Sequence, residues 1–437
     1  MKVFLDTVGC RLNQAEIEQM ARRLRAAGHE ITGNAAEADL AIINTCTVTN
    51  AAASDSRAAV RRAARAGVKA IVVTGCWATL EPESAAGLPA VKQVIPNSQK
   101  DALLMQVLGL PVEPFDLEPV AREPLPGLRA RTRAFIKVQD GCNNTCTYCV
   151  TRLARGAARS RSIAEVLAEV RAALQGGTKE IVLTGVHLGA WGQDLPPAPD
   201  RSPLRLSHLI TALLGELPIP RLRLSSLEPW DITPDFFSLW ADARLCRHLH
   251  LPLQSGSASV LQRMARKTRP EAFAALLETA RRLIPAIAIT TDVIVGFPGE
   301  SEAEFAETVE FVKRMGFAGG HVFAYSPRPG TPAARLEPQI RPEIKKERSA
   351  ILRQIFAESA LAFRRQFLGQ RVSVLWESAI PAAGSAWTLE GLTDNYLRVT
   401  VSAPQPRWNQ IDEVEIIGET PGGLLGRQIE GQSQAQT

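Results

Sequence analysis

The sequence lacks any apolar run of the roughly 20 residues that a membrane-spanning helix requires, so we expect no membrane partner. It contains seven cysteines in 437 residues, which do not make a disulfide scaffold. No secretory signal is evident, because the chain opens directly with a predicted strand at 2–5. We therefore expect a cytoplasmic protein, whose thiols are metal ligands or catalytic groups more often than disulfide partners.

The sequence also has little net charge for its size. The formal charge is +5, so local clusters of arginine matter more than the total for a polyanionic partner. Apolar residues make up 45% of the chain, which is enough for buried cores and excludes a disordered protein. A chain of 437 residues is too long for one ordinary domain, and we expect two or three.

Three of the cysteines lie together in the segment 139–150, Q-D-G-C-N-N-T-C-T-Y-C-V. Cys142, Cys146 and Cys149 have the spacing C-x3-C-x2-C, and three thiolates this close can bind three irons of a four-iron cluster. The fourth iron then stays open for a ligand. A structural zinc site needs four ligands, and no fourth cysteine or nearby histidine follows at a usual interval. A zinc knuckle or a redox loop is the alternative interpretation.

This segment resembles the cysteine motif of the radical S-adenosylmethionine (radical SAM) enzymes. The resemblance implies that the open iron binds the amino and carboxylate groups of S-adenosylmethionine. It also implies that an electron from the cluster splits the sulfonium and gives a 5′-deoxyadenosyl radical. The expected cofactors are therefore a 4Fe-4S cluster and S-adenosylmethionine.

Residues 1–120 predict a small parallel α/β (Rossmann-like) domain in which helical segments separate three strands. The predicted strands are residues 3–7, 39–45 and 70–74. Each strand runs into a cysteine: Cys10, Cys46 and Cys76. Singly, each thiol would be a buried small hydrophobe. Because ligand sites of such sheets lie beyond the carboxyl ends of the strands, three thiols there predict a second iron–sulfur cluster.

Residues 121–368 predict an open, partial (β/α)6 barrel. The first part of this region, residues 122–133, contains proline and arginine and is a predicted linker. The six predicted strands are Phe135–Val138, Ile181–Leu183, Arg221–Leu224, His248–Leu251, Thr291–Val295 and His321–Ala324. Capping-box patterns predict helix starts at Ser162 and Ser301. The cysteine loop follows the first strand, at the end where barrels of this kind carry their active sites.

Polar and small residues follow the other predicted strands as well. Gly185 allows close approach of the backbone to a ligand, and Ser226, Glu228 and Gln254 offer polar groups for ribose hydroxyls or a methionyl group. As a set they predict the S-adenosylmethionine site, although each residue alone is as often a loop cap or a helix cap. The sequence identifies no catalytic side chain.

The remaining chemically active residues near these strands are four histidines and one cysteine. We interpret the histidines as hydrogen-bonded scaffold residues: His187, His248, His250 and His321. Cys246 has no partner in the sequence and is interpreted as structural.

Residues 369–437 predict a small β-barrel after a long helix at about 342–368. The predicted strands are residues 371–376, 387–389, 395–401 and 414–417. The pattern resembles the TRAM domain, a small β-barrel that binds RNA. Most aromatic residues there should be core, while one or two stack on bases: Trp376, Trp387, Tyr396 and Trp408. The polar end at 430–437 should fray.

The order of these parts resembles the methylthiotransferases, radical SAM enzymes that insert sulfur and a methyl group into an unactivated C–H bond. The motifs that carry the resemblance are N-T-C-T-V-T-N at 44–50, the segment 135–148, L-T-G-V-H-L-G at 183–189 and H-V-F-A-Y-S-P-R-P-G-T-P at 321–332. They indicate the MtaB-like branch. That branch implies methylthiolation of carbon 2 of N6-threonylcarbamoyladenosine at tRNA position 37, just 3′ of the anticodon. It also implies a second 4Fe-4S cluster that holds the transferred group.

Clustered arginines agree with a tRNA anticodon arm as the partner, held by phosphate contacts over the barrel mouth. These are Arg57, Arg61, Arg62, Arg65, Arg129, Arg131, Arg133, Arg152, Arg155, Arg159 and Arg161. Any one run can instead be a solvated helix face. An electron donor such as flavodoxin or ferredoxin is a further expected partner.

The sequence leaves three other functions open. Two are enzymatic: methylthiolation of isopentenyladenosine in tRNA, or of an aspartate in a ribosomal protein. The third is a non-catalytic iron–sulfur carrier or RNA-binding scaffold. Side chains that line the barrel mouth decide between the enzymatic alternatives, and the sequence does not show which residues these are.

Overall fold

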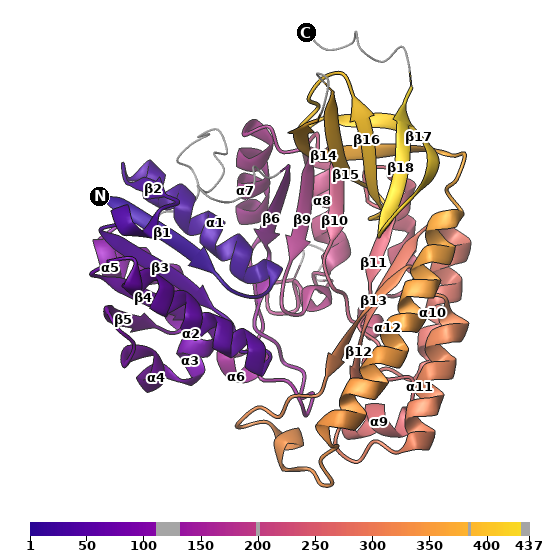
Figure 1. The fold of residues 1–437 in the computed structure, drawn as a ribbon, viewed down its shortest axis with the longest axis horizontal. Coiled ribbons are helices and arrows are strands. Elements are labelled where there is room, and N and C mark those ends of the chain that lie inside the picture. The colour runs from indigo at the N-terminus through magenta and orange to yellow at the C-terminus, as the bar shows by residue number, and fades with distance from the viewer. Residues whose placement is uncertain (111–131, 198–201, 383–385, 430–437) are drawn as a thin grey trace.

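The computed structural model describes residues 1–110, 132–197, 202–382 and 386–429. Most of the predicted linker at 122–133 and the polar end at 430–437 lie outside these residues. The chain forms a parallel α/β sheet, an arc of parallel strands with helices, and a closed β-barrel (Figure 1). This arrangement confirms the predicted fold class, while the boundaries at 120 and 368 stay predictions. Within the described residues, no helix is long and apolar enough to cross a membrane.

The first part is a five-stranded parallel sheet in the order β2-β1-β3-β4-β5. Its strands are β1 (Lys2–Thr7), β2 (Glu30–Thr32), β3 (Leu40–Thr45), β4 (Ile71–Gly75) and β5 (Val91–Ile95). Its helices are α1 (Arg11–Ala26), α2 (Asn50–Arg65), α3 (Cys76–Leu80), α4 (Pro82–Ala86) and α5 (Leu103–Leu108). The sequence predicted the three central strands. It missed the edge strands β2 and β5, because one is only three residues long and the other is half-exposed along most of its length.

Six parallel strands form the arc, as predicted. One three-stranded sheet contains β6 (Arg133–Lys137), β9 (Glu180–Thr184) and β10 (Arg221–Leu224), and the other contains β11 (His248–His250), β12 (Ala288–Val295) and β13 (Gly319–Ala324). A bridge between Ser226 and His250 joins β10 to β11 and makes the arc continuous. Two short antiparallel strands flank the cysteine loop: β7 (Gln139–Asp140) and β8 (Arg159–Ser160).

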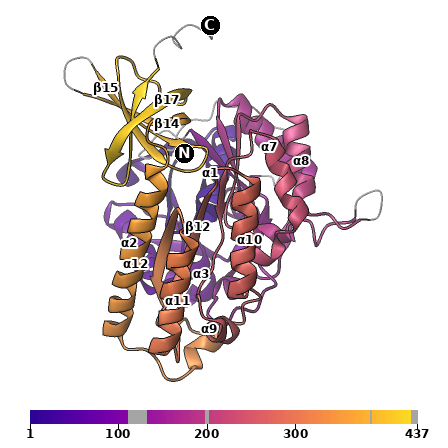
Figure 2. The same ribbon diagram turned by 90° about the vertical axis from the view of Figure 1, so that its right-hand side faces the viewer.

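Helices cover the convex side of the arc, and Figure 2 shows α10, α11 and α12 side by side there. The helices of this part of the chain are α7 (Ile163–Gln175), α8 (Leu206–Glu216), α9 (Ala258–Arg263), α10 (Pro270–Leu283), α11 (Glu302–Met315), α12 (Pro342–Arg365) and α6 (Thr151–Arg155), of which α6 lies against α3 of the α/β sheet. Both predicted capping boxes are present, at Ser162 before α7 and Ser301 before α11. Short 3-10 helices complete the chain: η1 (Ala35–Glu37), η2 (Asn97–Ala102), η3 (Leu188–Ala190), η4 (Pro229–Asp231), η5 (Pro234–Ala241) and η6 (Pro332–Arg335).

The alternation of side chains along β12 identifies the concave face of the arc. Ile289 and Val293 are buried in the main core, on the side that the helices cover. Thr290, Asp292 and Ile294 are only half-buried. Because successive side chains of a strand point to opposite faces, the half-buried set lies on the concave face.

The C-terminal part is a closed barrel in the order β14-β15-β16-β18-β17. Its strands are β14 (Arg371–Pro381), β15 (Trp387–Thr393), β16 (Arg398–Ala403), β17 (Ile411–Thr420) and β18 (Gly423–Gln428). The sequence predicted four of them. It missed β18 because two glycines and Arg427 leave that segment without a clear apolar alternation. Trp376 is fully buried in the barrel core, as expected, whereas Trp408 is exposed.

Tyr396 and Arg223 attach this barrel to the arc. Tyr396 has a φ of 68°, and its ring stacks on His248 with the ring centroids 4.7 Å apart. The Arg223 guanidinium lies 4.9 Å from the same ring and donates hydrogen bonds to the carbonyl oxygens of Thr393 and Asp394. Tyr396 is therefore half-buried between two parts of the chain, and its ring already stacks on His248.

We predict that Arg223→Met lowers the free energy of unfolding by about 3–5 kcal/mol, because it leaves Glu180 buried without its counter-charge. The Arg223 Nε lies 2.7 Å from a Glu180 carboxylate oxygen, and both side chains are fully buried. Lys313→Met, at an exposed pair with Glu310, should change the stability little. Urea denaturation measures both changes, and an unchanged midpoint for Arg223→Met would contradict this role.

Candidate metal centres

Three cysteines of the α/β sheet lie at one edge of it. Cys10 is the N-cap of α1 after β1, Cys46 follows β3, and Cys76 begins α3 at the end of β4. Since β1, β3 and β4 are neighbours, the three thiols converge. Burial is the main cause that raises the pKa of the Cys46 thiol to about 11, and the neighbouring Cys76 and Cys10 thiols add to it.

Gly9 allows the chain to fold this tightly. Its φ of +108° is a conformation that residues with a side chain rarely adopt, and a Cβ there would lie 2.7 Å from the Cys46 sulfur. The end of β1 can therefore lie this close to Cys46, at the end of β3, only because Gly9 has no side chain.

The other three cysteines lie on the loop between β7 and α6. The Cys149 amide donates to the Cys146 carbonyl at 3.1 Å, and the Asn144 amide donates to the Cys142 sulfur at 3.4 Å. The Arg266 guanidinium lies 3.9 Å from the Cys146 sulfur. Burial raises the pKa of Cys146, and this guanidinium opposes the rise. A cation beside a buried thiol favours the thiolate, which is the form that binds iron.

His187 orients the same loop from the end of β9. Its Nε2 lies 2.6 Å from Asp231, and its ring also contacts the Cys142 thiol. Burial alone would lower its pKa, but hydrogen bonds with Asp231 and Cys142 raise the pKa of His187 to about 9. The prediction of a hydrogen-bonded scaffold histidine is confirmed. The sequence did not indicate Asp231, which lies 44 residues further along the chain.

The residues predicted for S-adenosylmethionine lie at the carboxyl ends of β9, β10 and β11. Gly185 packs against Gln139, since a Cβ on it would lie 3.0 Å from that side chain. Glu228 accepts a hydrogen bond of 2.6 Å from Arg266, Ser226 is exposed, and Gln254 has a φ of 69°. Glu228 is thus linked to the cysteine loop through Arg266, and the role of all four residues as ligands stays a prediction.

A buried charge network joins the sheet to the cysteine loop. Arg155, at the end of α6, donates to Glu16 of α1 and to Asp140, each at 2.9 Å. Lys100 and Lys137 reach the same Glu16 carboxylate at 2.7 Å and 3.4 Å. Arg155 was expected among the arginines that face RNA, and this expectation is wrong, because its side chain is 2% exposed.

Two further side chains bridge the same boundary. The Asn97 amide donates to the Ala154 carbonyl at 2.8 Å and lies 3.6 Å from the Cys76 sulfur. Arg328, in the loop after β13, donates to the Thr47 hydroxyl beside Cys46. The segments that flank the two thiol triads are thus in direct contact.

Neither thiol triad forms a compact donor set of the kind that holds a single metal ion. Ligand sulfurs around one zinc ion lie about 3.8 Å apart, as bonds of about 2.3 Å in a tetrahedron require. Among the described residues, only His250, Asp292 and His321 bring three donor atoms within 4.8 Å of one another. Cluster ligation by the two triads therefore stays a prediction from their positions in the sequence.

Comparison with known families agrees with this fold and site. Residues 136–312 match the radical SAM superfamily, and residues 2–95 match the uncharacterised protein family UPF0004. Among solved structures, the radical S-adenosylmethionine methyltransferase TsrM from Kitasatospora setae has a TM-score of 0.55 at 16% identity, over 76% of this chain and 75% of that chain. That likeness is one of fold. Fold and thiol loop together define a radical SAM protein.

Curated relatives extend over nearly the whole chain. Threonylcarbamoyladenosine tRNA methylthiotransferase MtaB of Bacillus subtilis (strain 168) is 37% identical over 95% of this chain and 93% of its own length. The protein of the same name from Thermotoga maritima is 37% identical over 86% of each chain. A tRNA-2-methylthio-N(6)-dimethylallyladenosine synthase of Cereibacter sphaeroides is 35% identical over 98% of each chain. The chain therefore belongs to the MtaB-like methylthiotransferase family, as its motifs predicted.

We predict that Glu16 makes the stability of the contact between the α/β sheet and the arc sensitive to acid. Burial raises its pKa, but Arg155, Lys100 and Lys137 outweigh burial and hold the pKa of Glu16 well below its ordinary 4.5. A carboxylate with a depressed pKa stabilises the fold above about pH 4.5, and this stability is lost as the pH falls through its folded-state pKa. Glu16→Gln should therefore cost about 3–5 kcal/mol at pH 7 and remove part of the acid-induced loss.

Urea midpoints of iron-free protein between pH 7 and pH 3 check this prediction. Glu83→Gln, at an exposed position of α4, serves as the matched control and should follow the wild-type curve. Parallel curves for Glu16→Gln and wild type would contradict the prediction.

Proposed function

We propose that this protein methylthiolates carbon 2 of N6-threonylcarbamoyladenosine at position 37 of tRNA. The observation that carries this proposal is the 37% identity to the Bacillus subtilis methylthiotransferase over 95% of the chain. Contact between the segments around the two thiol triads supports it, because the reaction needs a radical source and a sulfur source at one base.

We propose two 4Fe-4S clusters as cofactors, one held by Cys142, Cys146 and Cys149, the other by Cys10, Cys46 and Cys76. When bound, the first cluster with S-adenosylmethionine would supply the radical chemistry, and the second would hold the sulfur or methylthio group that is transferred. The C-x3-C-x2-C motif of the first triad, and the position of the second triad at the ends of neighbouring strands, support this assignment.

The protein's own share is to hold and shield these groups. Arg266 places a positive charge beside Cys146, and Glu228 fixes that guanidinium through a second hydrogen bond of 3.0 Å. His187 holds Cys142 from the other side. These contacts tie two of the three cysteines to side chains from other parts of the arc.

We propose the anticodon arm of tRNA as the partner in the cytoplasm and a flavodoxin or ferredoxin as the electron donor. Exposed arginines support the RNA contact: Arg61, Arg62 and Arg65 on α2, and Arg152 and Arg159 beside the cysteine loop. The closed C-terminal barrel would add a TRAM-like RNA contact, with Trp408 exposed on it.

Methylthiolation of dimethylallyladenosine (isopentenyladenosine) in tRNA is the second candidate function. The Cereibacter sphaeroides synthase, which is 35% identical over 98% of the chain, favours it. The two candidates differ in the group on N6 of the adenosine, which is polar and anionic in one and apolar in the other.

Deletion of the gene should abolish the methylthio form of threonylcarbamoyladenosine in tRNA and let the unmethylthiolated nucleoside accumulate. Liquid chromatography with mass spectrometry of tRNA nucleosides measures both. The wild-type gene should restore the product, and a Cys142→Ala gene should not. Loss of the methylthio group from dimethylallyladenosine instead would favour the second candidate.

Anaerobically reconstituted protein should contain about eight irons per chain, and replacing the three cysteines of either triad by alanine should leave about four. Cys246→Ala is the matched control and should keep the full iron content, since that thiol is buried and burial raises its pKa to about 12. About four irons in the wild-type protein would contradict the second cluster.

A further inference from the structure

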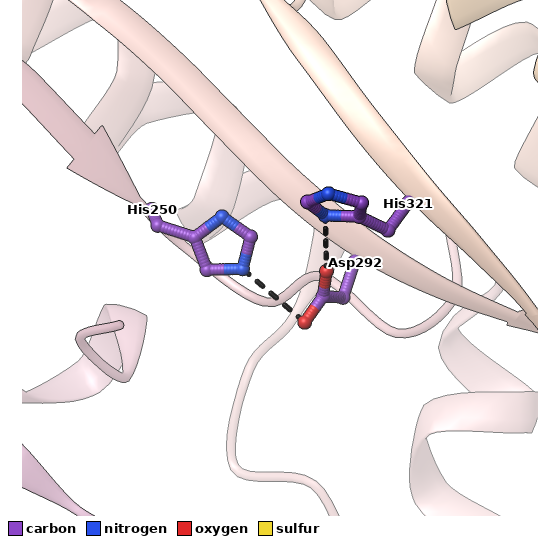
Figure 3. A group of neighbouring side chains, drawn as sticks. All are labelled: His250, Asp292 and His321. Atoms are coloured by element: carbon purple, nitrogen blue, oxygen red, sulfur yellow. Dashed lines mark hydrogen bonds and ion pairs between the residues drawn. The ribbon is translucent and has the colours of Figure 1, made fainter. Parts of the chain in front are cut away.

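Three titratable side chains outside the thiol triads meet on the concave face of the arc: His250 of β11, Asp292 of β12 and His321 of β13 (Figure 3). One Asp292 oxygen lies 3.2 Å from His321 Nδ1, and the other lies 3.2 Å from His250 Nε2. The strand register pairs Asp292 directly with His321. The cluster is therefore built into the sheet itself and not into its loops.

His321 is the accessible end of this cluster. Its side chain is 70% exposed, compared with 12% for His250 and 24% for Asp292. Its Nδ1 faces Asp292, which leaves Nε2 on the outer side of the ring (Figure 3). The other nitrogen of His250 is 2.9 Å from the Thr290 hydroxyl, so both nitrogens of that ring are engaged. A ligand on this face would meet His321 first.

The electrostatics of the cluster favour a positive charge on His321. Burial alone would raise the pKa of Asp292, but hydrogen bonds with His250 and His321 lower it. The same hydrogen bond raises the pKa of His321. The positive charge of Arg11 opposes that rise. Its guanidinium is oriented by a hydrogen bond of 2.7 Å to the Tyr396 hydroxyl.

Two imidazoles and a carboxylate can also hold a transition-metal ion. Two features of this site oppose a cation. Both Asp292 oxygens already face imidazole nitrogens, so the carboxylate has no oxygen reserved for a metal. The nearby Arg11 repels a further positive charge and attracts an anion.

Resting on the proposed function, we propose that His321, positioned by Asp292 and assisted by Arg11, binds the carboxylate of the threonyl group on the substrate adenosine. Threonylcarbamoyladenosine carries this carboxylate on its N6 substituent, whereas a dimethylallyl group has neither charge nor hydrogen-bonding atoms. A charge-assisted hydrogen bond from Nε2 to the carboxylate would select the first substrate. The second substrate would leave these polar groups without a partner.

The test measures binding of two anticodon stem-loop RNAs to anaerobically reconstituted protein. One RNA carries N6-threonylcarbamoyladenosine, and the other carries its methyl ester, in which the carboxylate is neutral. Wild-type protein should bind the free acid at least about tenfold more tightly, as expected for hydrogen bonds to a charged group. His321→Gln should lose most of this preference, with Arg11 accounting for what remains. His208→Gln, at an exposed position on α8, is the matched control and should keep the wild-type preference.

Equal binding of acid and ester by the wild type, or an undiminished preference in His321→Gln, would overturn the proposal. A preference that disappears when divalent ions are chelated would also overturn it, since the cluster would then act through a metal. Mass spectrometry of the reacted RNAs separates these results from the proposed function. Methylthiolation of acid and ester alike refutes only the carboxylate contact, whereas modification confined to a dimethylallyladenosine RNA refutes both.

Discussion

The ion pair between Glu16 and Arg155 determines how the parts of this molecule fit together. Both side chains are 2% exposed, and they join the helix after the first sheet strand to the helix after the cysteine loop. A buried pair persists only when its remaining hydrogen-bonding groups are satisfied, and Lys100, Asp140 and Asn13 satisfy them here. Loss of one member would leave the other charges buried without a partner. The network therefore fixes the two thiol loops relative to each other.

The contact between the α/β sheet and the arc is needed because the arc is open. Six strands leave β6 and β13 as free edges, which a closed barrel would not have. The α/β sheet lies beside this opening (Figure 1). Ala15 of α1 packs against Phe135 of β6 and Val182 of β9, while Arg328 beyond β13 donates to Thr47. The sheet therefore contacts the arc near both of its ends, and its cysteine edge adjoins the cysteine loop.

Sequence reasoning found the features that have local signals. Buried apolar runs located β3 and β4, and the spacing of Cys142, Cys146 and Cys149 indicated iron–sulfur chemistry. It could not find contacts made across the fold. Arg155 was grouped with RNA-facing arginines because its partner Glu16 is 139 residues away and belongs to no shared pattern. For the same reason it did not show that Asp292 pairs with His321, because that pairing follows from strand register, which no single segment specifies.

Arg11 connects the proposed chemistry to the proposed selectivity. It is the first residue of α1, directly after Cys10, and its guanidinium reaches Tyr396 of the C-terminal barrel. It also acts electrostatically on His321 of the arc. Two consecutive residues, Cys10 and Arg11, thus carry a thiol of the second triad and a cation for the substrate anion. An adenosine held by that cation would be held at a fixed position relative to Cys10, so substrate recognition and reaction geometry are not independent in this fold.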